Sequence, residues 1–175
     1  MNVYAKGALA GVALMVAGVV STAQAQATPA TASITATATV QTALAAAKVT
    51  DLDFGATFGG IAKTVLPTDV SSGEIGLTGA NNAEVTVSFT SLPAVLTGPG
   101  TNIPVTYGAN AGAFSAAGSR VGATTFDPAT GATTRLSNAT GLLSVYLGGT
   151  VTPAAAQAAG TYTGTVNFSA AYTGN

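Results

Sequence analysis

The chain has 175 residues, of which 6% are charged, and it contains no His, Cys or Trp. A typical soluble domain carries roughly 25% charged residues. Without His or Cys there is no His-based triad, no thiol nucleophile, and no His or Cys ligand for zinc, haem or an iron–sulfur cluster. Five Lys and Arg are too few to neutralise a nucleic-acid backbone. The composition therefore argues against an enzyme and against nucleic-acid binding, and it gives no reason to expect a cofactor.

Residues 1–25 are typical of an export signal. Residues 1–6 form a short N-terminal region in which Lys6 is the one charged side chain. The 14 residues 7–20 that follow are uncharged and mostly apolar. This run is shorter than the roughly 20 residues that span a bilayer. Small residues follow it at two overlapping cleavage sites, 23–25 and 25–27. We expect a secretory signal peptide cleaved after Ala25 and a mature chain that does not span the membrane. An uncleaved membrane anchor is the alternative.

Residues 26–41 predict one long extended strand. Small apolar side chains alternate with hydroxyl side chains, so one face of a strand is apolar. A strand with such small side chains needs a sheet edge to pair with, either in its own domain or in a neighbour's sheet. Ile34 and Val40 are the larger anchors of this face. The face consists of Ala32, Ile34, Ala36, Ala38 and Val40.

Residues 42–175 predict an all-β domain without a long amphipathic helix. Short alternating segments are separated by turns rich in Gly, Pro, Asn and Asp. This pattern is typical of an antiparallel sandwich or a barrel. The expected strands are 44–50, 62–66, 74–77, 84–90, 103–107, 121–126, 143–147, 150–151 and 162–172.

The terminal segment 162–172 shows the clearest alternation. One face of this segment is mostly apolar, and the opposite face carries hydroxyl and amide side chains, so we expect the apolar face to be buried. Residues 154–159 before it are expected to form a loop or a single turn. Gly148 and Gly149 suit a β-bulge or a close backbone approach. The apolar face includes Tyr162, Val166, Phe168, Ala170 and Tyr172.

Alternative functions are suggested by three side chains, those of Asp51, Asp53 and Tyr146. Asp51 and Asp53 could bind a hard cation such as Ca²⁺ or act as glycosidase carboxylates, but no third acid or Trp platform accompanies them. We expect them to cap backbone amides in a turn instead, and we expect no metal site. Tyr146 falls on the polar face of its strand, which makes it the tyrosine to test for glycan binding.

Two stretches carry a resemblance to a known family. They are LDFG at 52–55 and the segment 144–172, which ends in AGTYTGTVNFSAAY. With the alternating segment 30–40, they resemble the bacterial secreted family called domain of unknown function 4402. They are also similar to spore-coat protein U domains and to pilins of archaic chaperone–usher systems. The protein U domains usually carry a disulfide, whereas this chain has no cysteine.

The resemblance implies an immunoglobulin-like β-sandwich, and in the pilin relatives this sandwich lacks one strand. In the pilin relatives a periplasmic chaperone fills the resulting groove first, and the N-terminal extension of the next subunit then replaces it. Carried over here, the donor face is the apolar face of 32–40, and the groove is bordered by 162–172.

These observations together predict a secreted structural protein, a fibre or coat subunit assembled by strand addition. Its partners would be other copies or related subunits, a periplasmic chaperone and an outer-membrane usher. Its location would be the periplasm, the cell surface or an extracellular fibre of a Gram-negative bacterium. The alternative is a self-contained monomeric sandwich that binds carbohydrate or a surface, with its first strand paired inside its own domain.

Overall fold

The computed structural model describes residues 29–174, so the expected signal peptide over 1–25 lies outside the described residues. The described residues form twelve β-strands and no helix, which confirms the all-β prediction. In this range there is consequently no helix that could cross a membrane. Residues Thr39–Asn175 make one compact unit. The strands are β1 Ala45–Thr50, β2 Lys63–Val65, β3 Gly73–Thr78, β4 Glu84–Ser91, β5 Val95–Leu96, β6 Ile103–Thr106, β7 Gly112–Ser115, β8 Thr124–Phe126, β9 Ala132–Arg135, β10 Leu142–Leu147, β11 Gly149–Val151 and β12 Asn167–Tyr172.

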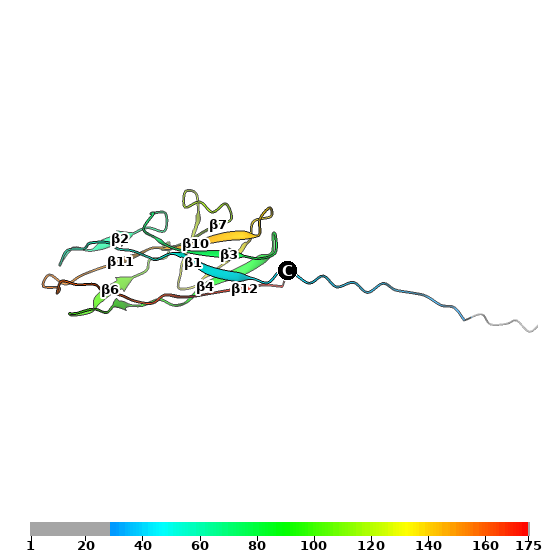
Figure 1. Ribbon diagram of the computed structural model, residues 1–175, viewed down its shortest axis with the longest axis horizontal. Coiled ribbons are helices and arrows are strands. Elements are labelled where there is room, and N and C mark those ends of the chain that lie inside the picture. Colours follow the sequence, from blue (N-terminus) through cyan, green and yellow to red (C-terminus); the bar gives the residue numbers. More distant parts are fainter. Residues whose placement is uncertain (1–28, 175) are drawn as a thin grey trace, which may run out of the picture. The chain divides into compact units, whose positions relative to one another are not determined.

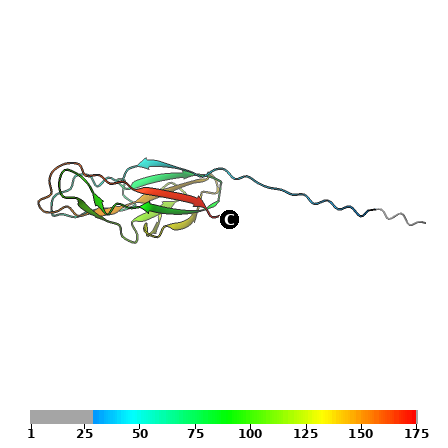
Figure 2. The ribbon, with the colours of Figure 1, turned by 90° about the horizontal axis from the view of Figure 1, so that it is seen from below.

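The strands form three antiparallel sheets. A five-stranded sheet has the order β1-β3-β10-β7-β8, and a three-stranded sheet has the order β12-β4-β9. These two sheets share one hydrophobic core and make a sandwich (Figure 1, Figure 2). The third sheet, β2-β11-β6-β5, lies at the end of the domain away from the C-terminus (Figure 1).

The main core forms between β4 and β10. Val85, Val87 and Phe89 of β4 are buried, and the residues between them face outward, as the period-two alternation predicts. Leu143, Val145 and Leu147 come from β10 on the opposite sheet. The ring of Phe89 stacks on Phe126 with centroids 6.3 Å apart. Each fully buried side chain of this size stabilises the fold by roughly 1.5–3 kcal/mol.

Gly148 links β10 of the five-stranded sheet to β11 of the third sheet. A Cβ at this position would overlap the carbonyl oxygen of Val65, so the predicted close backbone approach is confirmed. The strand that follows, β11, carries Val151 into a second core cluster. That cluster consists of Phe54, Val65, Ile103, Val105 and Val151.

Most of the expected strands are present, and two of them begin at least three residues later than expected. Gly122 turns the chain, so the strand expected at 121–126 begins only at Thr124. The terminal strand begins at Asn167 instead of Tyr162. Its partner segment there contains Pro93, which has no N–H to donate, and only an isolated bridge joins Thr163 to Thr97. Gln157 closes the expected single turn in 154–159 by donating its N–H to Ala154. The strands that sequence reasoning missed are β5, β7 and β9.

Candidate functional site

Two strands leave open edges on the same side of the sandwich. Among the described residues, β1 pairs only with β3, and β12 pairs only with β4. An edge strand presents a row of unpaired N–H and C=O groups. Residues of both strands line one pocket, and the two strands run in opposite directions (Figure 2). The gap between β1 and β12 is therefore bordered by pairing groups on each side, and we call it the edge groove.

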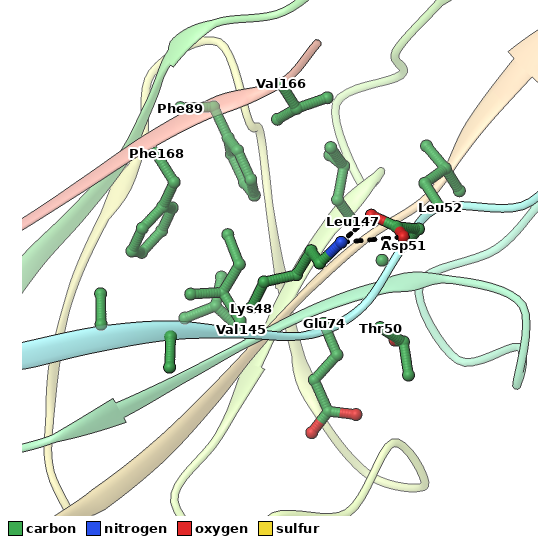
Figure 3. Close-up of a pocket in the computed structure, with 14 residues that line it drawn as sticks. Lys48, Thr50, Asp51, Leu52, Glu74, Phe89, Val145, Leu147, Val166 and Phe168 are labelled. Carbon is green, nitrogen blue, oxygen red and sulfur yellow. Dashed lines mark hydrogen bonds and ion pairs between the residues drawn. The ribbon is translucent and has the colours of Figure 1, made fainter. Parts of the chain in front are cut away.

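The floor of the edge groove is part of the main core. A pocket of about 260 Å³ lies between β1 and β12, and core residues Phe89, Val145 and Leu147 line it (Figure 3). Phe168 of β12 meets Phe89 edge to face, with ring centroids 5.4 Å apart. The three core residues are themselves buried, and the pocket lies above them because the two sheet edges do not meet.

A second pocket continues the edge groove toward the third sheet. Its volume is about 570 Å³, and it shares Asp51, Leu52 and Val166 with the first pocket. Burial raises the pKa of the Tyr107 phenol, which lines it, above the ordinary value. The other apolar residues that line it are Phe54, Pro93, Leu96, Ile103, Val151 and Tyr162.

Hydrogen bonds fix Tyr162 at the wall of this second pocket. Gln157 donates an amide N–H to the phenol oxygen at 2.7 Å. The phenol in turn donates to the carbonyl oxygen of Ala158 at 2.9 Å. The ring lies so close to Gly98 that a Cβ there would be 2.5 Å from a ring carbon. The position of Tyr162 is thus fixed by its own loop and by Gly98.

Lys48 stands on the core-facing side of β1. It pairs across the ladder with Ile75, and Ala46 pairs with Leu77, which is buried in the core. Directly paired residues of an antiparallel ladder share a face, so Lys48 points toward the edge groove. Its ammonium bonds both carboxylate oxygens of Asp51 at 2.9 Å. The two side chains are 66% and 76% exposed, so the pair contributes about 0–1 kcal/mol.

The residues expected to border the groove lie on one face of the terminal segment. Phe168, Ala170 and Tyr172 are half-buried, and the residues between them are exposed. Val166 and Phe168 line the first pocket, whereas Tyr162 and Val166 line the second. Ala170 and Tyr172 lie beyond both pockets and pack on the main core. Three of these five residues therefore line the two pockets.

The expected donor segment forms no strand in the described residues. Residues 29–44 carry no sheet pairing, and Ile34 and Val40 are each 95% exposed. The segment expected as a strand over 26–41 thus has no sheet partner within its own domain in its described part, and its pairing with a neighbour's sheet stays a prediction. An uncharged alternating segment becomes a strand only when an edge pairs with it. The exposed residues of its apolar face are Ala32, Ile34, Ala36, Ala38 and Val40.

Tyr146 does not fit the expected glycan site. It does lie on the outer side of β10, but it is fully buried. The guanidinium of Arg120 covers its ring at 4.9 Å from the ring centre, and Arg120 also pairs with Glu74 at 2.8 Å. A sugar ring has no access to Tyr146.

Asp51 and Asp53 have separate partners. Asp53 accepts a 2.7 Å hydrogen bond from the backbone N–H of Gly55, which is the turn cap that we expect. Asp51 differs from the expectation, because its carboxylate pairs with the ammonium of Lys48 instead. Over residues 29–174, no three His, Cys, Asp or Glu side chains gather closely enough to hold a metal ion.

Sequence reasoning missed the floor of the edge groove. Phe89, Val145 and Leu147 are readable as buried strand residues, but alternation does not show that the sheet edges above them stay apart. Leu52 lies in the LDFG motif, which is the local signal for one groove residue.

Comparisons with family models, curated proteins and solved structures gave no significant match.

Proposed function

We propose that this chain is a structural subunit of a surface fibre or coat, assembled when a strand adds to the edge groove. The observation that carries the proposal is the gap between two open sheet edges, β1 and β12, above a pocket that Phe89, Val145 and Leu147 of the core line from below. A strand placed there would pair with an open edge and cover apolar surface at once. The domain would then be an immunoglobulin-like sandwich completed by a partner.

The N-terminal segment of another copy has the properties that such a strand needs. Residues 29–41 contain no charged side chain, and they alternate apolar and hydroxyl residues. The described part is exposed and unpaired. Ile34 and Val40 would each gain roughly 1.5–3 kcal/mol on full burial, and the alanines would add less. The added backbone would also satisfy the open row of N–H and C=O groups.

The cellular setting follows from the same proposal. A subunit with an open groove needs protection until a partner fills it, which is the role of a periplasmic chaperone, and an outer-membrane usher would then export it. The export signal would bring the chain to the periplasm of a Gram-negative bacterium, and the finished fibre or coat would lie at the cell surface.

Deleting residues 28–40 tests the proposal. The truncated mature protein should keep its β-rich circular dichroism spectrum but form no filaments in electron micrographs. Ile34→Asp should act in the same direction because it places a charge on the apolar face. Thr35→Asp is the matched control, since it adds the same charge to the opposite face and should still allow assembly.

The proposal fails if the truncated protein still forms filaments. A purified mature chain that stays a stable monomer without a chaperone would instead support a self-contained module that binds carbohydrate or a surface. Light scattering on the eluate of a size-exclusion column separates these outcomes.

A further inference from the structure

We propose that Lys48 makes the edge groove selective for the small-residue face of residues 32–40, so that the added strand comes from a second copy of this chain. The inference rests on the proposed function and adds the residue that selects the incoming strand. It begins from a charged side chain on the core-facing side of an open edge, where an apolar residue would be the ordinary choice.

Lys48 occupies the middle of the edge groove. It lines the first pocket, and its ammonium is bound to Asp51, which lines both pockets (Figure 3). The aliphatic stem therefore lies beside the junction of the two pockets, with Leu52 and Val166 as the other shared side chains. A lysine can cover apolar surface with its stem while its charge stays in water. In the proposed arrangement this stem narrows the middle of the groove between the two pockets.

The N-terminal segment has the complementary pattern. Ile34 and Val40 lie six positions apart, or about 20 Å in a strand, and on the apolar face only Ala36 and Ala38 lie between them. The order large, small, small, large is symmetric about Thr37. In the proposed arrangement the two large residues lie at the two pockets and the alanines lie beside the Lys48 stem, in either direction of the strand.

A strand with larger side chains in the middle would not fit. It would displace the Lys48 stem and separate the ammonium from Asp51, and it would force a charge toward the apolar floor, which is costly without a partner. In an ordinary apolar groove, by contrast, larger side chains would strengthen binding because they bury more surface. The two models therefore predict opposite effects of larger side chains at positions 36 and 38 on assembly, which distinguishes selection by Lys48 from strand addition in general.

The test uses the full mature chain, which carries both the segment and the groove. The variant Ala36→Leu/Ala38→Leu should raise the concentration needed for assembly by about tenfold or more. Thr35→Leu/Thr37→Leu enlarges the opposite face by a similar amount and should stay within about twofold of the wild type. Adding Lys48→Ala to the first variant should restore assembly, because it removes the stem that the leucines meet. Light scattering over a concentration series gives each value.

Each outcome decides one claim. If Ala36→Leu/Ala38→Leu assembles as well as the wild type, or better, Lys48 selects nothing and the inference falls while the proposed function stands. If that variant is blocked and Lys48→Ala does not rescue it, the role of Lys48 is also overturned. If the wild-type chain itself never assembles, the proposed function and the inference fail together. Because Lys48 and residues 36 and 38 are exposed, the denaturation midpoints of the variants, measured at a protein concentration too low for assembly, should match the wild type and confirm that they fold.

Discussion

The phenol of Tyr172 donates a 2.8 Å hydrogen bond to the carbonyl oxygen of Thr42. It also accepts a 2.7 Å bond from the backbone N–H of Ala80. One hydroxyl thus joins the end of β12, the point where the chain enters the domain, and the turn after β3. Because β12 forms one wall of the edge groove, these two bonds hold that wall to the rest of the sandwich at its C-terminal end.

Tyr172→Phe should lower the free energy of unfolding by about 1–2 kcal/mol, because it removes both hydrogen bonds and leaves a half-buried N–H without its acceptor. Urea denaturation followed by circular dichroism measures the change. Tyr146→Phe is the matched control. The Tyr146 hydroxyl is buried without a hydrogen-bond partner in the described chain, so its removal should leave stability unchanged or raise it. Equal losses in the two variants would contradict this assignment.

Gly148→Ala should lower the free energy of unfolding by about 2–4 kcal/mol. The new Cβ would overlap the backbone oxygen of Val65, and a backbone atom in a paired strand cannot move aside cheaply. Gly108→Ala makes the same chemical change where no heavy atom lies within 4 Å, so it should be nearly neutral. Denaturant midpoints of both variants, taken in one buffer, provide the comparison, and a neutral Gly148→Ala would show that the link between β10 and β11 is loose.

The stability of the protein should fall above about pH 10, with Tyr107 as one cause. Burial raises the pKa of its phenol in the folded chain, so between the ordinary and the raised pKa the unfolded chain has lost a proton that the folded chain still holds. Fewer protons on the unfolded state mean that stability decreases as pH rises. Tyr107→Phe removes this contribution. Urea denaturation between pH 8 and pH 11 should give a shallower alkaline decline for the variant, and identical slopes would count against the assignment.

Arg120→Met should destabilise the fold by about 1–3 kcal/mol. It leaves Glu74, whose side chain is only 12% exposed, without its cation, and it removes the charge above the Tyr146 ring. Arg135→Met provides the contrast, because Arg135 pairs with Glu84 while it is itself 51% exposed. That pair should contribute less than about 1 kcal/mol. Thermal unfolding at low and high salt distinguishes the two, and a larger loss for Arg135→Met would reverse this ranking.

Alternation predicts the strands well where one face is large and apolar, as in β4 and β10. It fails for β7 and β9, since Gly112–Ser115 and Ala132–Arg135 contain few large apolar residues. Alternation also places Tyr146 on the outer side of its strand, but its burial depends on Arg120, which is distant in sequence. The terminal wall of the edge groove is readable from the sequence. The groove itself is not, because it exists only when β1 and β12 are both sheet edges.

The open edges between β1 and β12 also affect how the stability of this protein should be reported. Any strand that fills the gap binds the folded chain and not the unfolded one, so it raises the apparent free energy of unfolding by mass action. At one hundred times its dissociation constant, such a ligand adds about 2.7 kcal/mol. A melting temperature measured on this domain is therefore a property of a solution at a stated concentration.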